Sequence, residues 1–168
     1  MSKDSARNTK YSTLDLWFMH RGYGWTDAFL RVDSQTVEMQ VTHVFNDPLY
    51  EIARATVELI DDRQSSAFLW FEEPGTLAFE LTRDQRAPLL HGRLSTFPDL
   101  FLERIPRDAQ PLKTVNFTSH LGYWAALVQT SLCRSRELAR HKLYPWREVQ
   151  LPLEELAEIE RYLRVSGA

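Results

Sequence analysis

The chain is predicted to fold as an α+β protein in which helices pack on an antiparallel sheet of five to seven strands. Apolar and polar residues alternate with a period of two near the start, and two aromatic-rich runs separated by a turn dipeptide follow after residue 64; both are typical of strands. A helical period separates these two regions, and two further helical segments follow the second one. Strands that follow one another directly favour antiparallel pairing, whereas a parallel doubly wound sheet alternates strands with crossover helices.

Three strands joined as a meander are predicted before residue 46. Alternation over residues 14–19 indicates the first strand, and the glycines of HRGYGWTD, residues 20–27, predict a hairpin turn after it. The alternation resumes over residues 27–33 and again over residues 37–45. Consecutive alternating runs of this kind predict neighbouring antiparallel strands.

A central helix is predicted within NDPLYEIARATVELIDD, residues 46–62. Its apolar positions recur at the spacing of one helix face: Leu49, Ile52, Ala53, Thr56, Val57 and Ile60. Asp47 is the expected N-cap, and Pro48 suits the first helical position because a backbone N–H would have no helical partner there.

A hairpin is predicted over residues 65–82. Two aromatic-rich runs, SSAFLWFEE and TLAFELT, flank Pro74 and Gly75, which fit the two central positions of a type II turn. The adjacent carboxylates of Glu72 and Glu73 would point to opposite faces of a strand, or into solvent at the turn. We therefore interpret them as the shoulder of a turn and not as a catalytic pair of the kind that glycoside hydrolysis requires.

Two more strands and two helices complete the predicted order. Strands are expected over residues 89–95 and 113–117, with a proline-punctuated loop between them. A long helix is predicted from Thr118 or Ser119 to about residue 143, shortly before YPW ends it, and Pro152 opens the last helix. The sheet therefore has one central and two C-terminal helices to cover it.

The composition is that of a globular domain. A chain of 168 residues can bury a sufficient core by itself, so we expect a flexible tail over residues 1–10 and a single domain over residues 11–168. The net charge of −3 and the pI near 6.0 argue against a nucleic acid as partner. The polar start resembles neither a signal peptide nor a membrane anchor, and Cys133 is the only cysteine. These features favour a cytoplasmic protein.

No motif of a catalytic, cofactor or metal site is present in the sequence. The histidines lack the HxH and HExxH spacings, there is no GxSxG, and the GxG at residues 22–24 lacks a third glycine. We therefore assign no catalytic residue, no cofactor and no metal. His43 is in phase with core positions and is expected to be buried, whereas His20, beside the glycine turn, is expected to be the more accessible histidine.

Aromatic residues around the first predicted turn are the best indication of a binding surface. Tyr23 and Trp25 lie in the turn, and Trp17 and Met19 share the strand face opposite the expected core stripe. Either this sheet is covered on both sides, which we favour because most aromatic stripes belong to a core, or the aromatic residues form an exposed patch. In the second arrangement Trp17, Tyr23 and Trp25 would bind a partner.

The last helix carries the most concentrated negative charge, from Glu154, Glu155 and Glu158. Such a run is usually a solvated helix face, and acidic residues in a first turn also suit the helix dipole. The functional alternative is a docking surface for a basic partner.

The stretch DPLYEIARATVEL followed by WFEEPG is similar to small uncharacterised bacterial α+β proteins of the immunity-protein type. The resemblance covers roughly residues 41–82 and includes the capped helix and the turn. It implies a cytoplasmic protein that binds and neutralises a cognate toxin, and it carries no residue-level roles to this chain.

Three hypotheses about function follow. The first is a non-enzymatic protein-binding module, in the form of an immunity protein if the resemblance holds. The second is a small-ligand-binding protein or enzyme with a pocket between the sheet and the long helix, in which His20, His43 or Asp27 would supply polar groups. The third is a structural subunit that forms a homo-oligomer through its sheet.

Overall fold

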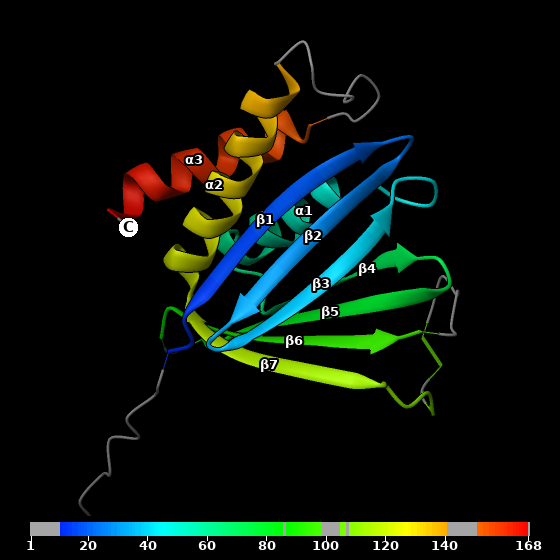
Figure 1. Cartoon of the computed structure of the whole chain (residues 1–168). Coiled ribbons are helices and arrows are strands. Elements are labelled where there is room, and N and C mark those ends of the chain that lie inside the picture. Colours follow the sequence, from blue (N-terminus) through cyan, green and yellow to red (C-terminus); the bar gives the residue numbers. More distant parts are fainter. Residues whose placement is uncertain (1–10, 86, 99–104, 107, 141–150, 168) are drawn as a thin grey trace, which may run out of the picture.

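The computed structural model describes residues 11–85, 87–98, 105–106, 108–140 and 151–167, and it has an α+β fold (Figure 1). Within these residues, seven strands form two antiparallel sheets, and three helices accompany them. The three-stranded sheet contains β1 (Leu14–Gly22), β2 (Trp25–Val32) and β3 (Gln35–Thr42). The four-stranded sheet contains β4 (Ser65–Glu72), β5 (Gly75–Arg83), β6 (Leu89–Phe97) and β7 (Lys113–His120). The predicted α+β class is confirmed, and the strands are divided between two sheets.

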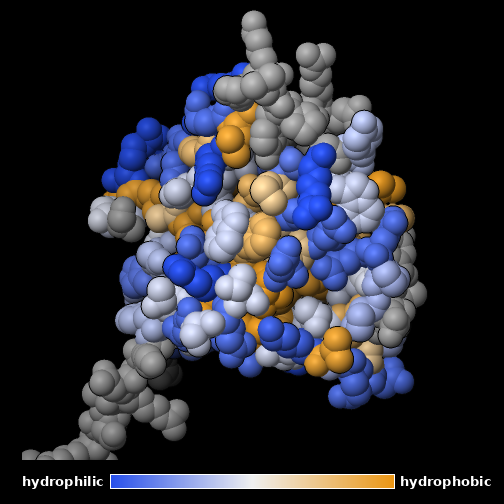
Figure 2. All heavy atoms as spheres, in the orientation of Figure 1, coloured by the Kyte–Doolittle hydropathy of each residue, from blue (hydrophilic) through white to orange (hydrophobic). Residues whose placement is uncertain are grey.

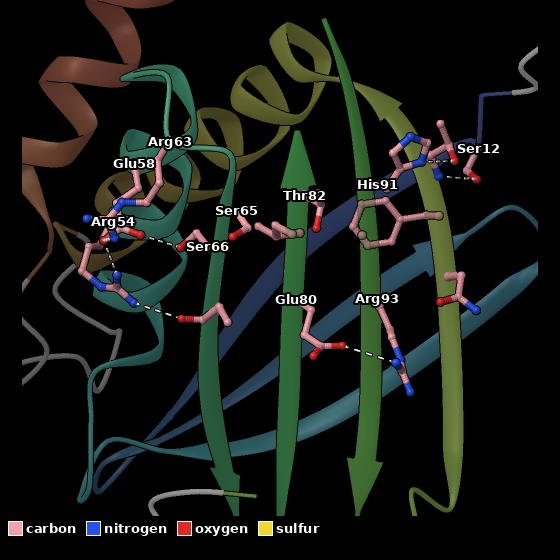
Figure 3. Close-up of a pocket in the computed structure, with 16 residues that line it drawn as sticks. Ser12, Arg54, Glu58, Arg63, Ser65, Ser66, Glu80, Thr82, His91 and Arg93 are labelled. Carbon is pink, nitrogen blue, oxygen red and sulfur yellow. Dashed lines mark hydrogen bonds and ion pairs between the residues drawn. The ribbon is translucent and has the colours of Figure 1, made fainter. Parts of the chain in front are cut away.

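The two sheets stack on each other with their apolar faces inward. The three-stranded sheet lies in front of the four-stranded sheet in Figure 1, and it lies behind that sheet in Figure 3. Phe18 of β1 meets Trp70 of β4 edge to face, with ring centroids 6.0 Å apart. We call the faces that meet the inner faces, and the two opposite ones the outer faces.

The helices close one side of this stack. The helix α1 (Pro48–Ile60) packs against β4, α2 (Leu121–Ala139) packs against β1, and α3 (Leu153–Ser166) packs on both other helices. The two largest core side chains also hydrogen-bond: Trp70 Nε1 donates to Pro48 O at 3.0 Å, and Trp124 Nε1 donates to Thr56 Oγ1 at 3.1 Å. These bonds satisfy the polar atoms that burial of a tryptophan would otherwise leave without a partner.

Capping residues decide where the helices begin. Asp47 is the N-cap of α1 as predicted, because its Oδ1 accepts from Leu49 N at 2.9 Å and from Tyr50 N at 3.2 Å. The helix α2 begins at Leu121, so the predicted start at residue 118 or 119 is wrong: Ser119 and His120 still pair with β6. The predicted end of this helix near residue 143, the YPW stretch and the tail over residues 1–10 lie outside the described residues.

The strand predicted over residues 37–45 ends earlier, at Thr42. The Thr42 hydroxyl accepts from Val44 N at 3.1 Å, which turns the chain out of the sheet toward α1. Asn46 then donates through Nδ2 to Leu69 O of β4 at 2.6 Å. The last predicted residues of the strand therefore form the connection between the two sheets.

The turn between β4 and β5 differs from the prediction. Glu72 pairs with Gly75, so Glu73 and Pro74 form the turn, and the peptide bond between them is cis. Pro74 thus occupies the third position, as in a type VI turn, and the predicted type II turn is wrong.

The two carboxylates of this turn have different environments. Glu73 is exposed, as expected of a turn shoulder. Glu72 is partly buried, and its Oε1 accepts from Gln40 N of β3 at 3.1 Å, so the prediction of a solvated side chain is wrong for this residue. Burial raises the pKa of Glu72, and the hydrogen bond from Gln40 N–H opposes that rise. Glu72 therefore joins the two sheets at the edge of β3.

Candidate interaction faces

The turn between β1 and β2 presents a tyrosine in an unusual conformation. Gly22 pairs with Trp25, which leaves Tyr23 and Gly24 as a two-residue turn with φ of 54° and 76°. Positive φ at both central residues is the type I′ hairpin turn, which favours Asn, Asp and Gly. A bulky residue with positive φ is an outlier, and the Tyr23 side chain is 96% exposed. The turn therefore holds an aromatic ring in solvent against the backbone preference of tyrosine.

An aromatic patch lies behind this turn, on the outer face of the three-stranded sheet. We define it as Trp17, Met19, Trp25 and Phe29. Trp17 and Phe29 are direct cross-strand partners, and their rings stack with centroids 4.9 Å apart and planes inclined by 8°. Met19 is 47% exposed, and Trp17, Trp25 and Phe29 are partly exposed. The favoured expectation that this face is fully covered is therefore wrong.

Figure 2 shows the side of the molecule that the three-stranded sheet forms, and apolar side chains emerge there between hydrophilic ones. A carboxylate lies close to the aromatic patch: Asp27, the cross-strand partner of Met19, is 1% exposed and forms an ion pair with Arg21. Its charge is thus neutralised within the protein, and the patch keeps an apolar character.

The acidic residues predicted on the last helix lie on a different part of the molecule. Glu154, Glu155 and Glu158 belong to α3, which packs on α1 and α2 and not on the three-stranded sheet (Figure 1). Glu158 forms an ion pair with Arg161 at 3.6 Å, which is typical of a solvated helix face. The structure therefore places Trp17 and Trp25 on the same outer face, with Tyr23 at the adjoining turn, and leaves the acidic helix apart from them.

The expectation that His20 is accessible is wrong. His20 follows the alternation of Phe18 onto the inner face and is only 4% exposed. Its Nδ1 lies 2.6 Å from Thr26 Oγ1, and its Nε2 lies 3.3 Å from Ser135 Oγ of α2. Thr26 Oγ1 also lies 2.8 Å from His43 Nε2, and the His43 side chain is 10% exposed, as the prediction of a buried His43 required.

The surroundings of this buried network favour the neutral form of both imidazoles. Burial, and then the neighbouring His43, lower the pKa of His20 to about 3. Burial also lowers the pKa of His43, although Asp47, 3.7 Å away, opposes the change. The network connects β1, β2 and α2 through hydrogen bonds between side chains, and its donors and acceptors pair with one another inside the core.

The second hypothesis places a pocket between the sheet and the long helix, and core side chains of the helix lie in that space. Trp124, Val128 and Leu132 of α2 are fully buried there. Two adjoining hollows of about 740 and 590 Å³ lie instead on the outer face of the four-stranded sheet, and Ala67, Glu80 and Arg93 line both. Figure 3 shows the larger one, with α1 along its β4 side. Sequence reasoning missed this face, although the small residues at its centre, Ala78 and Ser95, are a signal for it.

Comparison of the chain with protein-family models, with curated proteins and with solved structures gives no match. The resemblance to immunity proteins thus stays a prediction.

Within the described residues, no helix combines the length and apolar composition needed to cross a membrane. In the same part of the chain, no three His, Cys, Asp or Glu side chains gather as a metal site would require. What the geometry of the described residues defines is an α+β protein with two outer sheet faces, one carrying the aromatic patch and the other the two hollows.

Proposed function

We propose that this protein is a binding module for another protein and that the Tyr23 turn, with the aromatic patch behind it, makes the contact. The observation that carries the proposal is Tyr23 itself, 96% exposed at φ 54°. Residues held in sparsely populated backbone regions collect at functional sites, because elsewhere such a conformation would be replaced by an easier one. Asparagine or glycine would form this turn with less strain.

The chemistry of the aromatic patch supports the same proposal. Tryptophan and tyrosine dominate the residues that contribute most to binding in protein interfaces, since they bury a large area with few rotatable bonds. The stacked pair of Trp17 and Phe29 is held in place before any partner arrives. Binding would therefore order few additional side chains. Neutralisation of a toxin is the form of this function that the resemblance over residues 41–82 favours.

The test is site-specific photo-crosslinking in cells that express the full chain. A photoreactive phenylalanine analogue replaces Tyr23, and a control protein carries it in place of Tyr50, an exposed tyrosine on α1. We expect a discrete crosslinked protein from position 23 that is absent from position 50. The Trp17→Ala variant, with the analogue still at position 23, should reduce that product. Equal labelling at both positions, or no product at position 23, would contradict the proposal.

A further inference from the structure

On the outer face of the four-stranded sheet, the polarity of the side chains differs from row to row along the strands. Cross-strand pairing arranges its residues in rows. From one end to the other, the rows are Phe71, Thr76 and Phe97; Leu69, Ala78, Ser95 and Thr114; Ala67, Glu80, Arg93 and Asn116; and Ser65, Thr82, His91 and Thr118. Neighbouring rows are about 7 Å apart, since each is two residues from the next. The face is thus apolar at one end, charged in the third row and hydroxyl-rich at the other end.

The smaller hollow, of about 590 Å³, lies at the apolar end. It exists because Ala78 and Ser95, direct cross-strand partners, carry small side chains between larger neighbours. Leu69 and Phe97 line it from the sheet, and Ile105, Pro106, Ala109 and Pro111 line it from the described part of the β6–β7 connection. Its volume is within the range of about 300–1,000 Å³ that small-molecule sites occupy, and such sites are mainly apolar with a few polar groups.

A loosely held ion pair stands at the charged end of this hollow. Glu80 and Arg93 point toward each other from neighbouring strands (Figure 3), and their nearest charged atoms are 3.6 Å apart. The Arg93 side chain is 52% exposed and that of Glu80 is 59% exposed. An exposed pair at this distance is worth at most about 1 kcal/mol, so Arg93 is available to another carboxylate.

The adjoining trough of about 740 Å³ carries charges of both signs. Its described charged lining residues are Arg54, Arg63, Arg93, Glu58 and Glu80, and Glu51 beside it pairs with Arg54 at 2.7 Å. Glu58 already binds Arg54 at 2.7 Å and Arg63 at 2.8 Å, and it accepts from Ser66 Oγ at 2.6 Å. Burial alone would raise the pKa of Glu58, but the Ser66 hydrogen bond and the two arginines outweigh it and lower the pKa. Glu58, Arg54 and Arg63 are therefore engaged with one another, and Arg93, whose nearest contact with Glu80 is 3.6 Å, is the arginine of the trough that is held most weakly.

We propose that the outer face of the four-stranded sheet binds an elongated amphipathic anion, a free small molecule whose apolar chain fills the hollow and whose carboxylate meets Arg93. The chain would lie along the strands, over Ala78 and Ser95 and toward Phe97. The anionic end would replace Glu80 as the partner of Arg93. This site is separate from the Tyr23 turn and goes beyond the proposed function.

The test uses two probes with the same apolar chain and opposite charge, decanoate and decyltrimethylammonium, below the concentrations at which either forms micelles. The full chain is labelled with ¹⁵N and titrated with each probe, and amide shifts are followed. Decanoate should shift the signals of residues 78, 93, 95 and 97 in a saturable way. The cationic probe should bind about tenfold more weakly or worse, because it loses a charged hydrogen bond.

Four variants then locate the site. Arg93→Gln should weaken decanoate binding about tenfold, and Glu80→Gln should strengthen it by removing the competing carboxylate. Ala78→Leu should abolish binding by filling the hollow. The matched control is Arg31→Gln, because Arg31 and Asp15 form an equally exposed cross-strand pair on the other sheet, 3.2 Å apart, and this change should leave binding unaltered.

Each result has a defined meaning. Equal binding of the two probes, or an equal effect of Arg31→Gln and Arg93→Gln, would overturn the anion site. So would the absence of any saturable shift with decanoate. Because the exposed Arg93 and Glu80 side chains contribute little to folding, their variants report on binding even if Ala78→Leu fails to fold. Photo-crosslinking at position 23 is measured independently, so failure of one proposal is distinguishable from failure of the other.

Discussion

The two outer faces of this protein belong to sheets of the same kind but differ in shape, because one carries protruding rings and the other is hollowed. Both belong to antiparallel sheets whose inner faces share one core. On the three-stranded sheet the outward positions of β1 and β2 include large rings, and Trp17 stacks on its cross-strand partner Phe29. On the four-stranded sheet the corresponding central positions carry Ala78 and Ser95, and a hollow results. The period-two alternation fixes which residues face outward, and only their size decides whether the face protrudes or recedes.

The largest expected effect on stability comes from a substitution at Phe97, at the apolar end of the outer face of the four-stranded sheet. Phe97 points outward from β6 yet is only 6% exposed. Phe97→Ala should lower the free energy of unfolding by about 3 kcal/mol, as for other buried phenylalanines. Urea denaturation measures the loss, with Phe97→Leu as the milder control. A loss no larger than that of Trp17→Ala would show that the two outer faces are equally loosely packed.

Acid should destabilise the three-stranded sheet more than the four-stranded sheet, because only the three-stranded sheet is joined to α2 by the His20 network. The folded pKa of His20 is about 3, and its ordinary value is 6.5. Between these two values the unfolded chain binds the proton and the folded chain does not, so stability falls as the pH falls below 6.5. The loss is about 1.4 kcal/mol per pH unit, or about 2 kcal/mol at pH 5.

Hydrogen exchange at pH 7 and pH 5 tests this expectation. Amides of β1 and β2 should lose more protection than amides of β5 and β6, after correction for the intrinsic exchange rates. His91→Gln removes an exposed histidine from the other sheet and should leave the difference unchanged. Equal losses in both sheets would indicate that the network does not act locally.

Trp17→Ala should have a smaller effect, a loss of about 1 kcal/mol in the free energy of unfolding. The side chain is partly exposed, and an aromatic stack contributes about 0.5–1.5 kcal/mol beyond its area burial. Thermal unfolding measures the change, and Trp17→Phe, which preserves a stack with Phe29, should recover most of it. A loss comparable to that of Phe97→Ala would place Trp17 in the core.

The smallest expected effect has the opposite sign. Tyr23→Asn should raise the free energy of unfolding by about 0.5 kcal/mol, because asparagine tolerates the positive φ of this turn better than tyrosine does. The same change should weaken crosslinking of a partner when the reactive residue is moved to position 25. A variant that is less stable than the wild type would show that the Tyr23 ring supports the fold, and the argument from strain would fail.

The local elements were predictable from the sequence because their causes are local. Asp47 caps α1 as expected, since a cap needs only the residues that follow it. The burial of His20 was also predictable, because its position alternates in phase with the buried Phe18. This alternation is a better guide to its exposure than the neighbouring glycine turn. Partners far apart in the chain could not be predicted. Glu72 meets Gln40 only because two sheets join there, and Ala78 and Ser95 become neighbours only through the register of β5 with β6.

The side chains of α2 that reach the edge of β1 have a consequence for the behaviour of the protein at high concentration. Tyr123 OH donates to Leu14 O at 2.9 Å, and Ser131 Oγ donates to Leu16 O at 2.5 Å. Free carbonyls on an edge strand are where other chains add to a sheet and begin to aggregate. Two hydroxyl groups on a helix thus occupy acceptors that an additional strand would otherwise need.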